Sequence, residues 1–376
     1  MVTTAPDAES SHALAGTFDG LWRLARKGFK GSQGLFTQPR PRSFCHFGSS
    51  ISFRYFRTRG NEPLTRDESL INLNVHAEAF FIMSLPHPMD NIVVRQLRFD
   101  FDQTETGCVW SQSSPEFSMF LNALGIHVPY FERFLVKVMR QYRSELTDPS
   151  LAIDVQAIIG QEAHHAFNFV RWNQVLCARY PELRRLEQDA ESFFQTAFDA
   201  RSKRFKVGFT AGYETFTFLG GMIILDRYEE LMGDADPDLR ALWVWHQVEE
   251  VEHGAVAFDF YRALYPDDQW YRRLMIVHAF LHISWQTFKA YRHMMNREGY
   301  YHSVRKAVTG WRFFFGFAWD LARSALPVFS RQYHPRTHPI CNEQQNPVAV
   351  AWRDYVLAGG RPEHLDSQTS QHLSAP

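Results

Sequence analysis

The stretch WVWHQVEEVEHGAVAFDF, residues 243–260, places charged and histidine side chains inside an apolar helical pattern. His246, Glu250 and His253 follow one another at spacings of four and three residues. At about 100° per residue, these three side chains share one face of a helix. Ionisable groups on a buried helix face must be compensated, and metal ions can do this. The stretch therefore predicts a long helix, residues 238–264, whose inner face binds metal.

Three earlier helical segments, 130–146, 150–179 and 203–232, carry matching side chains in apolar surroundings. Two of them contribute a single glutamate and one contributes a Glu-x-x-His pair. In a helical bundle, one Glu from each of two helices and one Glu-x-x-His from each of the other two can hold two metal ions. The candidate ligands, which we also expect to be the catalytic residues, are Glu132, Glu162, His165, Glu214, His246, Glu250 and His253.

The donor atoms of this set are carboxylate oxygens and imidazole nitrogens. Four carboxylates can neutralise two divalent cations, and such donors suit iron or manganese better than structural zinc. The cysteines form no CxxC pair, which argues against a thiolate site or a disulfide framework and fits a reducing cytoplasm. They are Cys45, Cys108, Cys177 and Cys341. We expect two iron ions, with manganese or a mixed iron–manganese pair as alternatives.

Each of these features has a plainer interpretation when taken alone. A Glu-x-x-His pair is often a solvated helix face, a lone His246 is often a hydrogen-bonded core histidine, and Glu132 next to Arg133 can face solvent. The agreement of order, helix placement and donor chemistry favours the joint interpretation as a metal site.

Four neighbours of the candidate ligands have expected roles of their own. Glu252 points away from the line of His246 and is expected to be solvated, and His164 is expected to contact substrate or solvent. Gln161 and Glu249 each precede a candidate ligand. By pseudo-symmetry, we expect Gln161 to hydrogen-bond His253 and Glu249 to hydrogen-bond His165, which would fix the histidine tautomers.

The remaining pattern predicts an all-α chain with further helices at 182–202, 269–295 and 302–327. Residues 92–102 have the sequence IVVRQLRFDFD, part of which alternates between apolar and polar side chains. This pattern predicts a strand or an extended arm. We expect an N-terminal extension over residues 1–90, disordered at 1–12 and with a short helix at 17–29. A di-metal domain is expected over 91–340 and a tail over 341–376.

Residues 207–225 are nearly long enough to span a membrane but contain Glu214. A carboxylate in mid-membrane is costly, so we expect a helix buried in the bundle and no membrane span. The formal net charge of −1 gives no reason to expect nucleic acid or an anionic membrane as a partner. The N-terminus has no signal-peptide pattern, which favours the cytoplasm.

The two C-terminal helices are rich in aromatic residues, as in WQTFKAYRHMM and WRFFFGFAWDLARSALPVF. An apolar patch there is typical of a dimer interface, a pocket lid or a membrane-surface contact. Of these we favour a homodimer interface.

Several segments together resemble a bacterial family described as predicted metal-dependent hydrolases. They are GQEAHHAFNFVRWN (160–173), TAGYETFTF (210–218), LWVWHQVEEVEHGAVAFDFY (242–261) and YHPRTHP (333–339), and the resemblance runs from roughly residue 92 to residue 339. It implies a ferritin-like four-helix bundle with a di-metal centre. With His246 as its third histidine, the ligand set also resembles that of the arylamine N-oxygenases, which bind a di-iron pair with four Glu and three His. This chain departs from the family at Phe169 and Thr215, where relatives tend to have histidine.

The resemblance implies, as our first hypothesis, an O2-dependent monooxygenase that takes electrons from an external donor. Its substrate is expected to be a small molecule, aromatic in character, that is hydroxylated on carbon or oxygenated on nitrogen. The alternative enzyme is a binuclear metal-dependent hydrolase, in which the metal pair lowers the pKa of a bound water. A metal-storage or metal-sensing protein is the non-enzymatic alternative.

Overall fold

The computed structural model describes residues 87–90, 92–101, 109–341 and 345–374. All regular secondary structure in these ranges is helical, which confirms the predicted all-α class. The chain divides into two compact units, Met1–Glu78 and Ala79–Pro376, and every described residue belongs to the second unit. The predictions for residues 1–12 and 17–29 lie outside the described residues.

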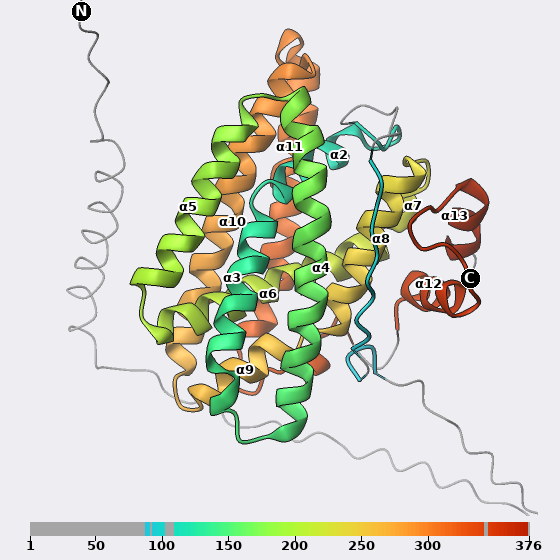
Figure 1. Ribbon diagram of the computed structural model, residues 1–376. Coiled ribbons are helices and arrows are strands. Elements are labelled where there is room, and N and C mark those ends of the chain that lie inside the picture. The colour runs from blue at the N-terminus through green and yellow to red at the C-terminus, as the bar shows by residue number, and fades with distance from the viewer. Residues whose placement is uncertain (1–86, 91, 102–108, 342–344, 375–376) are drawn as a thin grey trace, which may run out of the picture. The chain divides into compact units, whose positions relative to one another are not determined.

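Four helices form the centre of the molecule: α3 (Val128–Tyr142), α4 (Pro149–Arg179), α6 (Lys203–Asp226) and α8 (Pro237–Glu252) (Figure 1). Side chains cap the N-termini of three of them, α4, α6 and α8. Asp148 accepts a hydrogen bond from Ser150 N at the start of α4, and Asp236 accepts from Leu239 N at the start of α8. Since such caps satisfy otherwise unpaired backbone N–H groups, they fix where these helices begin.

Helix α6 is buried along almost its entire length, as the sequence predicted for residues 207–225. Helix α10 (Gln269–Arg297) packs closely against it at Gly212. A Cβ atom at Gly212 would lie 2.6 Å from the carbonyl oxygen of Met275, so only glycine allows this approach. No helix in the described ranges is long and apolar enough to cross a membrane.

The prediction of one continuous helix over residues 238–264 is wrong. Helix α8 ends at Glu252, and α9 (Val256–Leu264) begins after a turn at residues 253–255. Phe218 of α6 packs against this turn so closely that a Cβ atom at Gly254 would lie 2.6 Å from its ring. The turn therefore brings the chain onto α6 immediately after the metal-site motif.

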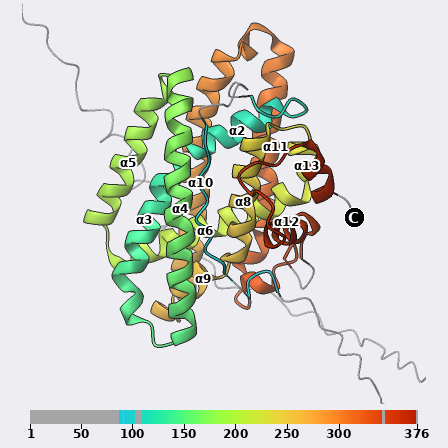
Figure 2. The same cartoon turned by 45° about the vertical axis from the view of Figure 1, so that its right-hand side comes forward.

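Residues 92–101 form an irregular segment that runs along α4, and the structure assigns no strand to them (Figure 2). Side chains of α4 replace the hydrogen bonds that a neighbouring strand would supply. Asn168 accepts from Phe99 N at 3.1 Å and donates to Leu97 O at 3.0 Å. Gln161 donates to Val93 O at 3.0 Å.

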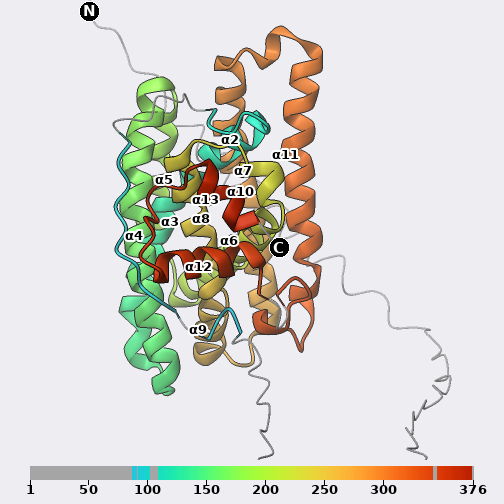
Figure 3. The same ribbon diagram turned by 90° about the vertical axis from the view of Figure 1, so that its right-hand side faces the viewer.

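The region beyond residue 341, in which the sequence indicated no helix, contains α12 (Pro347–Leu357) and α13 (Ser367–Ser374). Both lie beside α8 (Figure 3). Trp352 and Leu365 are fully buried, and the buried Arg240 of α8 donates to Leu365 O at 2.7 Å. This region is therefore packed onto the helical body.

The remaining helices surround the central four. They are α2 (Pro115–Gly125), α5 (Leu183–Ala200), α7 (Tyr228–Met232) and α11 (Val304–Ser324). Helix α10 is joined to α11 through the short helix η2 (Tyr300–His302), and both helices were predicted within a few residues of their observed bounds.

Candidate metal centre

All seven predicted ligands are buried and their side chains meet between α3, α4, α6 and the end of α8. They form two groups of four in which one donor atom of each residue lies within 4.8 Å of the others. The first group is Glu132, His165, His246 and Glu250; the second is Glu162, Glu214, Glu250 and His253. Glu250 belongs to both groups.

The two oxygens of Glu250 face different groups. Oε1 lies 3.0 Å from His246 Nε2, and Oε2 lies 3.1 Å from His253 Nε2. Glu162 on α4 has a related position, since Oε2 lies 3.6 Å from His165 Nδ1 and Oε1 lies 3.1 Å from His253 Nε2. These two glutamates can therefore bridge two adjacent ions, while Glu132 and Glu214 each face one group.

The predicted partners of two histidines are present. Gln161 Oε1 lies 2.9 Å from His253 Nδ1, and Glu249 Oε2 lies 3.0 Å from His165 Nε2. Each oxygen accepts a hydrogen bond from the ring nitrogen that points away from the cluster. The opposite nitrogen, Nε2 of His253 or Nδ1 of His165, then carries the lone pair that a metal ion requires.

Several donor atoms of the cluster have no hydrogen-bond partner among the described residues. They are Oε2 of Glu132, both carboxylate oxygens of Glu162 and of Glu214, and Nδ1 of His165. Buried polar atoms are normally satisfied, because an unpaired one costs about 1–3 kcal/mol. Unpaired oxygens and nitrogens that converge on two points fit a pair of metal ions.

Burial controls the ionisation of the two single glutamates. Together with the nearby charge of Glu162, it raises the pKa of Glu132 and of Glu214 to about 8. Burial also opposes ionisation of Glu250, but the charges of His253 and His246 outweigh it and hold the pKa of that carboxyl well below its usual range. The protein without metal therefore binds protons at positions that cations would occupy.

The prediction that Glu252 is solvated is wrong. Its side chain is buried, because Arg95 from the segment before α2 reaches over α8 and donates to its two oxygens at 2.8 and 2.9 Å. Arg95 also donates to Glu249 at 3.0 Å, and Gln161 donates to Glu252 at 3.1 Å. A connected network thus holds the partners of both histidines. The plainer interpretation of Glu132 as solvent-facing is also wrong, since only 1% of it is exposed.

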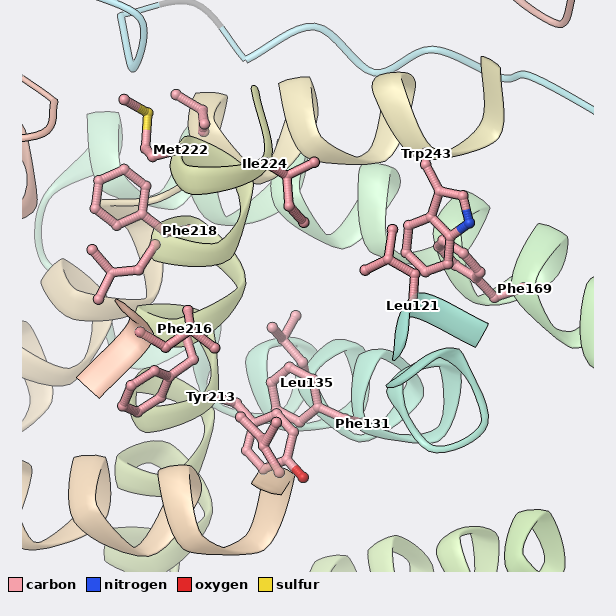
Figure 4. Packing of buried hydrophobic residues seen from close by; sticks show 14 of the residues in the cluster. Leu121, Phe131, Leu135, Phe169, Tyr213, Phe216, Phe218, Met222, Ile224 and Trp243 are labelled. Carbon is pink, nitrogen blue, oxygen red and sulfur yellow. The ribbon is translucent and has the colours of Figure 1, made fainter. Parts of the chain in front are cut away.

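The two departures from the family pattern have different surroundings. Phe169 is fully buried, and its ring packs against Trp243 at 4.8 Å (Figure 4). The same ring lies edge-on to His246 at 4.7 Å. Thr215 is partly exposed and donates to Ala211 O at 2.8 Å. His164 is likewise partly exposed on α4. An apolar ring therefore stands beside the first group of candidate ligands.

A cavity of about 50 Å³ reaches the cluster at His246 and is lined by residues of α2, α3, α6, α8, α10 and α11. Apolar side chains make up most of its wall, including Phe120, Leu124, Phe216, Ile224, Trp243 and Ile283. The polar groups in the wall belong to Tyr213, Thr217, His246 and Gln247, and none of the described residues that line it is Asp, Glu, Lys or Arg.

Sequence reasoning missed Arg95, Trp243 and Gln247. The side-chain amide nitrogen of Gln247 lies 2.9 Å from His246 Nδ1. The position of Gln247 next to His246 in the sequence was the one available signal. Arg95 gave no signal, because its partners lie more than 150 positions later in the chain.

Comparison with known proteins is consistent with a metal-binding site. The model of a family described as predicted metal-dependent hydrolase matches residues 93–339, about two thirds of the chain, and the chain belongs to this family. No curated protein and no solved structure matches the chain. The resemblance to this family is thereby confirmed, whereas the ferritin-like type of bundle stays a prediction.

Proposed function

We propose that this member of the predicted metal-dependent hydrolases is a two-metal enzyme, with Glu132, Glu162, His165, Glu214, His246, Glu250 and His253 as its ligands. The observation that carries the proposal is the division of the Glu250 carboxylate between His246 and His253, at 3.0 and 3.1 Å. A carboxylate in this position can join two ions, and the unpaired donor atoms around it fit the same arrangement.

Two bound iron or manganese ions would supply either electrons for reaction with dioxygen or Lewis acidity that activates water. The protein's own groups determine how that chemistry is presented. Gln161 and Glu249 orient His253 and His165, and Arg95 holds Glu249 in place. Phe169 and Trp243 exclude water from one side of His246.

The cavity favours an oxidation with dioxygen as co-substrate. It offers an apolar surface to a small uncharged, aromatic molecule and holds no charged side chain that would bind a phosphate or carboxylate group. As one oxygen atom of O2 is inserted into a C–H or N–H bond, the second is reduced to water with two electrons from an external donor and two protons from solvent. In this proposal the cavity positions the substrate beside His246.

Hydrolysis is the second candidate, and the family description favours it over oxidation. It requires a group that protonates the leaving group. Glu132 lies 3.3 Å from His246, and burial raises its pKa to about 8 in the metal-free protein, but as a metal ligand it would be ionised and could not supply that proton. The comparisons with known proteins lend oxidation no support. The proposal of oxidation therefore rests on the apolar cavity and on the donor atoms of the candidate ligands.

One experiment separates these candidates. The protein is loaded anaerobically with Fe(II), reduced, and exposed to O2 with a panel of small uncharged aromatic compounds that includes aromatic amines, while oxygen uptake and products are measured. In parallel, the Mn(II)- and Zn(II)-loaded protein is assayed under argon with esters and phosphoesters. Glu250→Ala should abolish the activity, and Glu191→Ala, which changes an exposed glutamate of α5, should not.

Each result has a clear meaning. Repeated O2 uptake with oxygenated product supports oxidation, and turnover under argon supports hydrolysis. Uptake of O2 once per centre without product would indicate storage or sensing. An enzyme that keeps its activity after Glu250→Ala would contradict the two-metal proposal altogether.

A further inference from the structure

The outer side of α10 carries a continuous row of exposed apolar side chains. Trp270, Leu274, Val277, Leu281 and Trp285 are between 36% and 72% exposed. Their spacing of three or four residues places them within about 80° of one another around the helix. The opposite side of α10 packs against α6 and lines the cavity with Ile283.

Helix α11 carries a second row of the same kind. Val304, Val308, Phe315 and Trp319 are between 59% and 83% exposed. The two rows hold nine of the sixteen large apolar side chains that are exposed among the described residues. Exposed apolar residues on a soluble protein are usually scattered, so this concentration marks a contact surface.

The two rows form one surface. Ring centroids of Trp285 and Phe288 on α10 are 5.7 Å apart, and those of Phe288 and Trp311 on α11 are 4.9 Å apart. Trp311 in turn lies 5.9 Å from Phe315. This series of aromatic rings joins the rows from one helix to the other, and the two helices run alongside each other on either side of the turn at η2 (Figure 3).

The charge of this helix pair differs from that of the whole chain. Helices α10 and α11 together contain nine Lys or Arg residues, of which Arg272 is buried and Arg297 is paired with Glu182, and one acidic residue, Asp320, whereas the chain has a formal net charge of −1. Arg305, Arg312 and Arg323 are all exposed and, at spacings of seven and eleven residues, they lie on one side of α11 beside the apolar row. Asp320 lies 3.6 Å from Arg227 of the chain beyond α6.

We propose that this surface, the exposed side of α10 and α11, docks on a lipid bilayer that contains anionic lipids. Amphipathic helices with Trp, Phe and Leu next to Lys and Arg lie in the plane of a membrane interface, with the apolar row inserted and the cations at the lipid headgroups. Charge complementarity selects this occupant. A second copy of the chain would bring the same excess of positive charge to the interface and repel the first. Docking of this kind needs no membrane-spanning helix and does not depend on the metal centre.

The test is flotation of the full-length, metal-loaded protein with vesicles of phosphatidylcholine alone or of phosphatidylcholine mixed with phosphatidylglycerol. We expect binding at least about tenfold tighter to the anionic vesicles, and a decrease of that binding when salt screens the charges. Trp285→Ser with Trp319→Ser should abolish binding to both kinds of vesicle. Arg305→Glu with Arg312→Glu and Arg323→Glu should abolish the preference for anionic vesicles.

Matched controls change similar side chains elsewhere. Ile153→Ser with Leu357→Ser removes two exposed apolar residues, and Arg140→Glu with Arg184→Glu and Arg185→Glu reverses three exposed arginines. Both control variants should bind as the parent does, and circular dichroism should show that all variants are folded. Absence of vesicle binding, or binding that the α10–α11 variants leave unchanged, would overturn the proposal. A dimer in sedimentation that Trp285→Ser with Trp319→Ser dissociates would also overturn it and assign the surface to a second copy.

Discussion

The side-chain oxygen of Gln161 on α4 lies 2.9 Å from Nδ1 of His253 at the end of α8. The same relationship occurs in the opposite direction, since Glu249 of α8 lies 3.0 Å from Nε2 of His165 on α4. In each pair, the residue immediately before a candidate glutamate ligand fixes the histidine of the other helix. The two halves of the centre are therefore locked by reciprocal hydrogen bonds.

We expect Gln161→Ala to weaken metal binding by about 10- to 100-fold, because His253 loses the acceptor that fixes its tautomer. Chelator competition, followed by metal analysis of the protein, measures this change. Gln332→Ala changes an exposed glutamine and is the matched control. Unchanged affinity in Gln161→Ala would show that His253 is oriented by other contacts.

Metal binding should release protons and become tighter as the pH rises from about 6 to 8. Burial raises the pKa of Glu132 and Glu214 to about 8, so both carry protons in the metal-free protein at neutral pH. Burial also lowers the pKa of His165, but the nearby carboxylates of Glu162 and Glu249 outweigh it and raise that pKa to about 9. Titration calorimetry in buffers of different ionisation enthalpy counts the released protons, and a count near zero at pH 7 would contradict this expectation.

The same raised pKa values determine how the stability of the metal-free protein varies with pH. A group whose pKa is higher in the folded state stabilises the fold below its unfolded pKa, and this stabilisation is lost as the pH rises through the folded pKa. For Glu132 and Glu214 that window runs from the ordinary value of 4.5 to about 8. The increase in Tm on adding metal should therefore grow over this window.

Gly220 of α6 lines the cavity, and a Cβ atom there would have Leu321 Cδ2, at 3.9 Å, as its nearest neighbour. Gly220→Leu should therefore fill the cavity without displacing backbone, and leave the metal content unchanged. We expect xenon, an apolar atom that suits a cavity volume of about 50 Å³, to bind about tenfold or more weakly, as followed by xenon NMR. Gly316→Leu, at an exposed position of α11 with no atom within 4 Å of its Cβ site, is the control. Equal binding by both variants would place the xenon atom elsewhere.

Arg95→Ala should destabilise the fold by about 3 kcal/mol, since it leaves Glu249 buried without its guanidinium partner and leaves Glu252 with Arg353, 3.6 Å away, as its remaining one. Urea unfolding of the metal-free protein measures the effect. Arg98→Ala removes an exposed arginine of the same segment and should change the free energy of unfolding by less than about 0.5 kcal/mol. A loss for Arg95→Ala as small as that for Arg98→Ala would show that water replaces the guanidinium.

The candidate site could be predicted from the sequence because it is built on helices. Residues three or four positions apart share a helix face, so His246, Glu250 and His253 could be recognised as one set without a structure. The contact of Gln161 with His253 followed from the pseudo-symmetry of the two motifs and is confirmed.

The remainder depends on contacts that helical spacing does not encode. Glu252 was predicted to be solvated because it points away from His246 on the helix. Its side chain is buried by Arg95, which is far away in the sequence. The turn at Gly254 results from close packing against Phe218 of a different helix. The nearly neutral net charge likewise gave no indication of the basic side of α10 and α11, because acidic residues elsewhere in the chain balance the positive charges of these two helices.

Anomalous diffraction from crystals of the iron- or manganese-loaded protein, recorded at the absorption edge of the metal, tests the two-metal centre most directly. We predict two peaks per chain, about 3.5–4 Å apart, with the carboxylate of Glu250 between them. Glu132, His165 and His246 should contact one peak, and Glu162, Glu214 and His253 should lie around the other. A single peak, or peaks away from these residues, would contradict the account.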